Sequence, residues 1–246
     1  MTRHVARLPA AMGQAHLPVF DSPEHKRRSV RAMFDRVAPR YEAANRAMTL
    51  GLDGRWRRRL LDELGVVGED RVLDLACGTG DFLRLLAARG VEPVGLDLSE
   101  LMLRQAPRAF PRVQAAGEAL PFADASFDVV VSGFAIRNFA SVGEVIAEVA
   151  RVLRPGGRFG IIEVAEPSWR VARWVHGAYF RHLAPLIGWA VGGDREAYRY
   201  LPASVAFLPS PAEMARMLVA SGFIPPRRLL VGQGAAQLVV TVRRRG

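Results

Sequence analysis

Hydrophobic and polar positions follow two alternating periods along the middle of the chain. Short apolar runs predict five strands, at residues 71–76, 92–97, 112–115, 128–132 and 158–164. Amphipathic stretches between them predict helices over residues 81–89, 99–106 and 142–153. The last of these helices is followed by Pro155-Gly156-Gly157, which predicts its end. Strands that alternate with helices in this way indicate a parallel α/β sheet.

The carboxyl-terminal segment has a different pattern. A helix predicted over 211–221 stops at Gly222, and two strands follow over 223–231 and 237–242. No helix separates these two strands, so we expect an antiparallel hairpin at the edge of the sheet.

Both flanks of this core are expected to be helical. Val30, Met33, Phe34 and Val37 recur at helical spacing, Pro39 interrupts the pattern, and further helical patterns continue to residue 64. Residues 168–206 are rich in tryptophan and tyrosine and break the alternation. We therefore expect one domain over residues 26–246, with a helical lid (residues 26–64) and a helical insertion after the fifth strand (residues 168–206). Residues 1–25 are predicted to form a flexible tail.

Composition narrows the class of protein. The 246-residue chain is 50% hydrophobic and 24% charged, which excludes a disordered or collagen-like chain. The single cysteine, Cys77, excludes an intramolecular disulfide framework and a multi-cysteine metal site, and no metal is predicted. No apolar run is long enough to span a membrane. The first 25 residues lack the apolar core of a secretory signal, and a disordered tail is favoured over a transit peptide.

Charge is unevenly distributed. The formal net charge is +10, and Lys26 is the only lysine among 34 basic residues. Residues 1–62 and 166–246 each carry a net +7, whereas residues 63–165 carry a net −4. Basic flanks around an acidic middle favour an anionic surface such as a lipid membrane as partner, and arginines on solvated helix faces are the equal alternative. A uniform nucleic-acid-binding surface would not need the acidic middle.

A glycine turn joins the first predicted strand to its helix, in the order Asp74-Leu-Ala-Cys-Gly78-Thr79-Gly80. Ligands of open α/β sheets bind at this edge, and Asp97 ends the next strand, where an acid typically bonds ribose hydroxyls. The third glycine of a dinucleotide site is absent, and Asp81 near the helix start would repel a diphosphate. S-adenosylmethionine, a cation without phosphate, fits better. Asp74 would orient the turn or bond the amino-acid end of this cofactor; a tight turn without ligand is the alternative.

Two later segments support this cofactor. They are Glu118-Ala-Leu-Pro-Phe122 with Asp124 and Phe127-Asp128, and Arg151-Val-Leu-Arg-Pro-Gly-Gly157. With the glycine turn, in this order, they resemble the S-adenosylmethionine-dependent methyltransferases. The resemblance implies a Rossmann-like, doubly wound, mostly parallel seven-stranded sheet.

A narrower resemblance lies in the lid, after the fourth strand and in the insertion. The segments are Met33-Phe-Asp-Arg-Val-Ala38, Tyr41-x-x-x-Asn45, Met48-Thr-x-Gly51, Trp56-Arg-Arg58, Phe134-x-x-Arg137-Asn138 and Tyr198-x-Tyr200-Leu201-x-x-Ser204. They are similar to the ubiquinone/menaquinone biosynthesis C-methyltransferases. The resemblance implies C-methylation of a reduced isoprenoid quinone precursor, either demethylmenaquinol or a polyprenyl benzoquinol. A methyltransferase for another small aromatic metabolite is the alternative.

The chemistry assigns roles to the matching residues. The ring must be reduced, because a hydroquinol is electron-rich and a quinone is not. Arg137 would lie above the cofactor and stabilise a developing phenolate, since an arginine is a poor base. Tyr41 and Asn45 would bond the ring oxygens from the lid, and Asn138 would fix Arg137 or the second ring oxygen. The alternatives are surface packing for Tyr41 and Asn45, and an ion pair with a core acid for Arg137.

The resemblance also implies cofactor contacts at Thr79, Asp97 and Ser132. Ala116 and Gly117 stand where the family usually has a polar residue followed by alanine, so backbone groups are expected to line the adenine there. The terminal hairpin reads Gly232-Gln-Gly234 in place of the family's threonine-glycine and histidine pattern. These departures suit a divergent quinone enzyme or a relative recruited to another aromatic substrate.

The partners follow from the expected substrate. A lipophilic quinol stays in a bilayer, so the apolar stretch around Leu183, Ile187 and Trp189 is expected either to contact a membrane or to pack against the sheet or a second subunit. The expected location is the cytoplasm, at the inner face of the membrane. A non-catalytic cofactor-binding protein and an RNA methyltransferase are further hypotheses. The acidic middle and the lack of an RNA-reading motif argue against nucleic acid.

Overall fold

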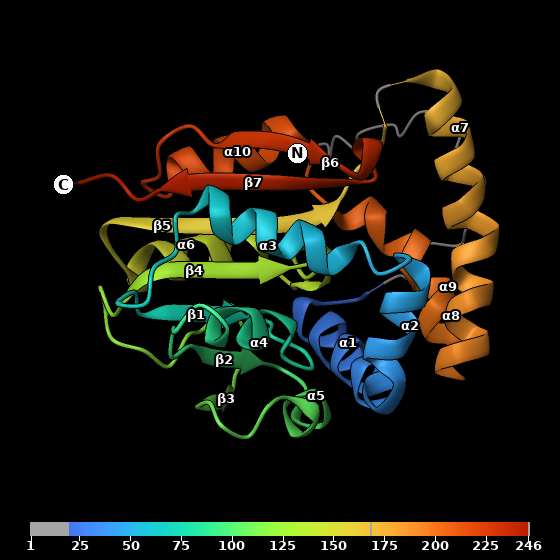
Figure 1. The fold of residues 1–246 in the computed structure, drawn as a ribbon, viewed down its shortest axis with the longest axis horizontal. Coiled ribbons are helices and arrows are strands. Elements are labelled where there is room, and N and C mark those ends of the chain that lie inside the picture. Colours follow the sequence, from blue (N-terminus) through green and yellow to red (C-terminus); the bar gives the residue numbers. More distant parts are fainter. Residues whose placement is uncertain (1–19, 168, 246) are drawn as a thin grey trace.

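A seven-stranded sheet forms the centre of the protein (Figure 1). The computed structural model describes residues 20–167 and 169–245. Its strands are β1 (Val72–Leu75), β2 (Val94–Asp97), β3 (Arg112–Gln114), β4 (Phe127–Gly133), β5 (Leu153–Val164), β6 (Arg227–Val231) and β7 (Ala236–Val242). Their order is β3-β2-β1-β4-β5-β7-β6, with β1 to β5 parallel and β7 antiparallel to both neighbours. The predicted parallel sheet and its antiparallel edge hairpin are confirmed.

Helices cover both faces of the sheet, as the predicted doubly wound fold requires. Val129 and Val131 of β4 pack with α3 (Asp53–Glu63) and α4 (Asp81–Ala87). Val130, between them, belongs to the core formed with α6 (Val142–Val152) and α10 (Pro211–Ala220). Because successive side chains of a strand point to opposite faces, an almost wholly apolar strand serves both cores. The short helix α5 (Glu100–Gln105) packs against β2 and β3.

The lid and the insertion lie together beside the carboxyl ends of the parallel strands (Figure 1). The lid begins with α1 (Pro23–Val37), a 3-10 turn (Ala38–Arg40) and α2 (Tyr41–Met48). The insertion comprises α7 (Arg170–Ala178), a π-helical turn (Tyr179–Leu183), α8 (Ala184–Gly192) and α9 (Arg195–Ser204). Helix α2 packs along α8.

Glycines allow the helices of the insertion to approach closely. Tyr198 of α9 is buried, and a Cβ atom added to Gly188 or Gly192 of α8 would lie 2.2 Å from it. The aromatic ring therefore fills the space that side chains on this face of α8 would take. In this way the helices of the insertion pack into a cover beside the carboxyl ends of the parallel strands.

Several element boundaries differ from the sequence prediction. Helix α1 starts at Pro23 with Ser22 as its N-cap, before the predicted start at Lys26, so the expected tail ends earlier; residues 1–19 lie outside the described residues. Helix α6 ends at Val152, because Leu153 is already extended and begins β5. Strand β6 starts at Arg227 and not at residue 223, because Pro225 and Pro226 have no N–H to donate to a ladder.

Three short 3-10 turns complete the fold: Ile136–Asn138 after β4, Val205–Phe207 after α9, and Gly232–Gly234 between β6 and β7. Within residues 20–167 and 169–245, no helix is long and apolar enough to cross a membrane.

Candidate active site

The glycine turn and Asp97 meet at the carboxyl ends of β1 and β2. The backbone N–H of Gly78 donates a 2.8 Å hydrogen bond to one carboxylate oxygen of Asp97, and the N–H of Ser99 donates a 2.8 Å bond to the other. Gly80 adopts φ +88°, and a Cβ atom there would lie 2.5 Å from Pro107. Only glycine suits this position. Asp97 thus holds the turn and the start of α5 in one arrangement.

A narrow cavity extends from this turn across the carboxyl ends of the parallel strands. Gly78, Asp97, Ala116 and Gly117 all line it, together with the ring of Phe139. A Cβ atom at Gly117 would lie 2.8 Å from that ring, so the glycine makes room for Phe139. The structure brings these four predicted cofactor residues together around a single cavity.

Asp74 and Thr79 are polar and almost inaccessible to solvent. Asp74 is 1% exposed and Thr79 is 4% exposed. Neither carboxylate oxygen of Asp74 has a hydrogen-bond partner of normal geometry among the described residues, and the Thr79 hydroxyl also lacks one. Burial raises the pKa of Asp74 well above its ordinary value. Such orphaned polar groups beside the glycine turn fit the ammonium end of an amino-acid cofactor. Neither side chain lines a cavity, so their cofactor contact stays a prediction.

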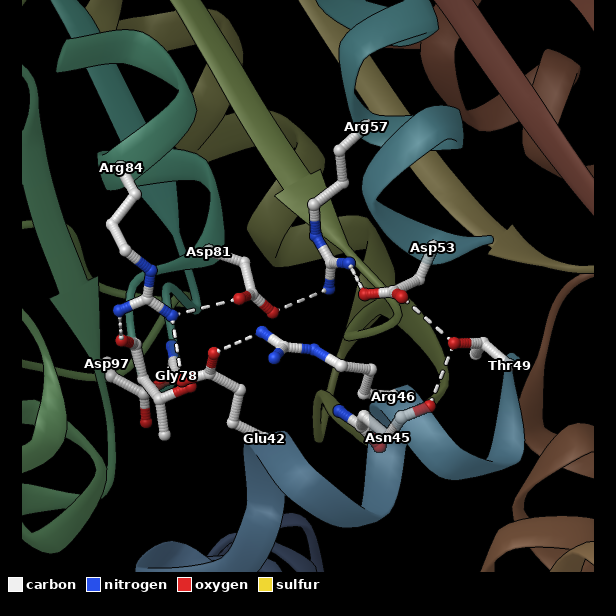
Figure 2. A network of polar contacts seen from close by, with 11 residues as sticks. Glu42, Asn45, Arg46, Thr49, Asp53, Arg57, Gly78, Asp81, Arg84 and Asp97 are labelled. Atoms are coloured by element: carbon white, nitrogen blue, oxygen red, sulfur yellow. Dashed lines mark hydrogen bonds and ion pairs between the residues drawn. The ribbon is translucent and has the colours of Figure 1, made fainter. Parts of the chain in front are cut away.

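Asp81 does not present the free charge that the sequence suggests. Its carboxylate forms ion pairs with Arg57 at 3.3 Å and with Arg84 at 3.0 Å (Figure 2). These ion pairs weaken the repulsion that Asp81 would exert on a diphosphate. The orphaned Asp74 carboxyl is the better reason to expect a cationic ligand.

Ser132 is fully buried and is not part of either cavity wall. Its hydroxyl donates a 2.9 Å hydrogen bond to the carbonyl oxygen of Leu75 in the neighbouring strand β1. In this arrangement its side chain links two strands, and its contact with the cofactor stays a prediction.

A second, larger cavity of about 610 Å³ lies between the lid, the insertion and the sheet edge. Most of its wall is aliphatic or aromatic. All four predicted catalytic residues, Tyr41, Asn45, Arg137 and Asn138, line it. A volume of this size is typical of small-molecule sites.

The two cavities meet at four residues that line both: Phe34, Tyr41, Phe134 and Asn138. The rings of Phe34 and Tyr41 pack edge to face with centroids 5.9 Å apart. Phe134 follows β4 with φ +58°, an unusual conformation for a bulky residue that concentrates at functional sites. We call these four residues the junction. The junction is the part of the wall that the two cavities share.

Arg137 lies in the cavity wall, and its Nε and Nη1 atoms are engaged by neighbouring groups. Only 5% of it is exposed. It forms an ion pair with the buried Glu163 and donates hydrogen bonds to Ser204 Oγ at 3.0 Å and to the Phe134 carbonyl at 2.9 Å. The ion pair with a core acid, the alternative for this residue, is therefore present. It also fixes a positive charge at the wall of the cavity.

The remaining predicted catalytic residues lie close to Arg137 in the same cavity. Asn138 donates a 3.4 Å bond to the Phe134 carbonyl and accepts a 3.2 Å bond from the Tyr200 hydroxyl. Burial raises the pKa of Tyr41, while Asn45 and the charge of Arg57 act in the opposite direction. Tyr41 is therefore a hydrogen-bond donor near neutral pH.

Asp53 and Arg57 are site residues that the sequence interpretation missed. Both line the large cavity, and they form an ion pair one turn apart on α3, a spacing that the sequence does contain. Thr49 Oγ1 donates a 2.9 Å bond to Asp53, and Arg57 continues the chain of contacts to Asp81 (Figure 2).

The same network ties the lid to the glycine turn. Arg84 donates to the Thr79 carbonyl at 3.0 Å. It also donates to Glu42 of α2 at 3.0 Å (Figure 2). The lid is thus held against the cofactor turn by charges from three helices.

Known proteins resemble this chain over most of its length. The model of the ubiE/COQ5 methyltransferase family matches residues 22–241. A demethylmenaquinone methyltransferase of Roseiflexus sp. strain RS-1 is 39% identical over 233 residues, which cover 92% of this chain and 98% of that protein. One of Deinococcus radiodurans is 42% identical over 215 residues, covering 84% and 89%.

Solved structures agree on the fold. A SAM-dependent methyltransferase from Thermotoga maritima superposes with a TM-score of 0.62 at 18% identity, covering 87% of this chain and all of that one. One from Aquifex aeolicus superposes with a TM-score of 0.55 at 17% identity, covering 76% and 88%. The chain belongs to the ubiE/COQ5 methyltransferase family and is a methyltransferase that uses S-adenosylmethionine.

Proposed function

We propose that this enzyme methylates a ring carbon of demethylmenaquinol, the reduced precursor of menaquinol. The observation that carries the proposal is the meeting of two unlike cavities at the junction. Four of the predicted cofactor residues line the narrow one, and Arg137, Asn138, Tyr41 and Asn45 line the large apolar one. Relatives named demethylmenaquinone methyltransferase that align over most of their length support the naphthoquinol over the benzoquinol.

When bound, S-adenosylmethionine supplies the methyl group as an electrophile. Asp97, Ala116 and Gly117 would hold its adenosine part in the narrow cavity, and Asp74 with Thr79 would receive its amino-acid end. The family model, which spans residues 22–241, supports treating residues 26–246 as one methyltransferase domain.

Residues of the chain prepare the ring to attack the methyl group. The fixed guanidinium of Arg137 stabilises negative charge on a ring oxygen without itself exchanging a proton. Tyr41 donates a hydrogen bond to an oxygen, and Asn45 and Asn138 hold the ring in place. The apolar wall excludes water, which strengthens these polar contacts.

An assay by mass spectrometry tests this reaction. Purified protein is mixed with S-adenosylmethionine and demethylmenaquinol kept reduced, beside an oxidised control. We expect a product heavier by one methylene unit in the reduced sample alone. Cofactor binding without product in either sample would reject demethylmenaquinol as substrate, and the benzoquinol counterpart would then be assayed.

We also propose that the insertion contacts the membrane that holds the quinol. Five of its apolar side chains are markedly exposed: Trp169, Trp174, Leu183, Leu186 and Trp189. The surrounding segment, residues 166–246, carries a net +7, which complements anionic lipids.

Flotation with anionic vesicles tests this contact. We expect co-flotation of the protein at low salt and its loss on Trp174→Ser with Trp189→Ser. If the protein forms a dimer in solution that both substitutions disrupt, and does not float, then the face is a subunit interface.

A further inference from the structure

The large cavity has a definable opening. Most of the residues that line it are buried or half-buried, and four are exposed: Leu50, Trp169, Gly232 and Gln233. They come from three separate segments, which are the turn between α2 and α3, the link from β5 to α7, and the turn between β6 and β7. We call these four residues the mouth.

Two of the four mouth residues have large apolar side chains, where a solvent-facing rim would ordinarily be polar. Leu50 and Trp169 are each 78% exposed, more than any other large hydrophobic side chain of the described chain. A water-soluble substrate would gain nothing from them. A hydrocarbon passing between them would remove both from water.

The backbone around the mouth is held in unfavourable conformations. Leu50 has φ +53° and Gln233 has φ +56°, in the left-handed region that favours glycine. Strain of this kind persists where the surrounding structure imposes it, and it is concentrated at ligand-binding sites. Both turns therefore place these residues at the opening at an energetic cost.

The mouth and the junction are formed by different residues of the wall of the large cavity. None of the four mouth residues lines the narrow cofactor cavity, whereas all four junction residues do. A ring held at the junction for reaction would carry any long substituent outward. Among the described residues, the mouth is the exposed part of the wall of the large cavity.

We propose that the mouth is the exit of the substrate's isoprenoid tail, and that Leu50 and Trp169 bind its first unit. This proposal rests on the proposed function, because it assumes a quinol ring at the junction. It also explains where one departure from the family pattern acts. Gln233 of the Gly232-Gln-Gly234 turn lies at the mouth, so this departure changes tail recognition and leaves the ring chemistry intact.

The experiment compares two reduced naphthoquinols, one with a single isoprene unit and one without a tail. Both are used without membrane or detergent, so a failure of membrane docking cannot imitate the result. The variants are Leu50→Ser, Trp169→Ser and the double variant. Val67→Ser is the matched control, because Val67 is 57% exposed and lines neither cavity.

For the double variant we expect kcat/KM on the one-isoprene substrate to fall at least tenfold. On the tail-less substrate it should change less than twofold, and the control should change less than twofold on both. Equal losses on the two substrates, or no loss on either, would overturn the proposal. Cofactor affinity and melting temperature identify a variant that fails to fold. If the double variant does not fold, the single variants are assayed in its place. We expect the kcat/KM of each to fall about threefold on the one-isoprene substrate alone.

A failure of the proposed function has its own signature. If wild-type enzyme methylates neither naphthoquinol, the proposed reaction is rejected. Calorimetric binding of the two oxidised compounds then tests the mouth by itself. Tighter binding of the tailed compound that the double variant abolishes supports the exit, and equal binding of both compounds by wild type overturns it.

Discussion

The Tyr200 hydroxyl donates a 3.2 Å hydrogen bond to the side-chain oxygen of Asn138. The two residues are 62 positions apart, one on α9 of the insertion and the other in the turn after β4. Asn138 also donates to the Phe134 carbonyl, which in turn accepts from Arg137. The insertion therefore orients a residue of the junction directly.

Loss of this hydroxyl should slow the reaction. Tyr200→Phe removes one neutral hydrogen bond, worth about 1 kcal/mol, so we expect a fall in kcat of about fivefold. Asn138→Ala should lower kcat further, and the double variant should be no slower than Asn138→Ala alone. Steady-state kinetics on all three variants measure the coupling. Additive effects in the double variant would show that the two side chains act independently.

Asp74 should matter for the cofactor more than for the fold. Asp74→Asn removes the charge available to the cofactor's ammonium group, and we expect binding to weaken by about 10- to 100-fold, as for a charge-assisted hydrogen bond of about 1.5–3 kcal/mol. Because the buried carboxyl has no partner, the cofactor-free variant should be at least as stable as wild type. Calorimetry and urea unfolding check the two effects. A large loss of stability with unchanged affinity would assign Asp74 a purely structural role.

Cofactor affinity should increase with pH through Asp97. Burial raises the pKa of Asp97 to about 6 from an ordinary value of 3.8. Its ionised form accepts hydrogen bonds from ribose hydroxyls better, so affinity should rise as the pH passes about 6 and then level off. Titration calorimetry from pH 5 to 8 measures this step. Asp97→Asn should abolish it, and a step that persists in this variant would have another origin.

The same shift has the opposite effect on stability. Between pH 3.8 and about 6, the folded protein keeps a proton on Asp97 that the unfolded chain has released. The contribution of this group to the unfolding free energy therefore falls as the pH rises through that window. Urea unfolding of wild type and Asp97→Asn at pH 5 and pH 7 isolates this contribution of Asp97 to the unfolding free energy.

The buried ion pair of Arg137 with Glu163 allows the effect of Arg137 on stability to be separated from its effect on the reaction. Removing either partner leaves a buried charge, so Arg137→Ala and Glu163→Ala should each lower the unfolding free energy by about 3–5 kcal/mol. The double variant should lose less stability than the two single losses combined. If Arg137 stabilises the ring oxygen, the double variant recovers stability without recovering kcat. Recovery of both would reduce Arg137 to a structural residue.

Gly80 should tolerate no side chain. Gly80→Ala places a Cβ atom 2.5 Å from Pro107 at a positive φ, and we expect a loss of about 2 kcal/mol in unfolding free energy with weaker cofactor binding. Gly143→Ala is the matched control, because Gly143 lies in α6 with nothing within 4 Å of its added Cβ atom. It should be neutral or stabilising by up to about 1 kcal/mol. Equal effects of the two substitutions would contradict this account.

The alternation of strands and helices, the glycine turn and Asp97 were all readable from the sequence. These features are local: a strand such as 128–132 is defined by its own apolar run, and the turn by its own glycines. The resemblance in the lid and insertion also placed Tyr41, Asn45, Arg137 and Asn138 on one site, and the structure puts all four in one cavity.

Tertiary structure alone decided which partner each polar group has. The ion pair of Asp81 with Arg57, the bond of Ser132 to Leu75, and the pairing of Arg137 with Glu163 join elements whose relative placement depends on strand order and helix packing. No local pattern encodes such pairings. The mouth likewise exists only because three turns, distant in sequence, converge on one opening.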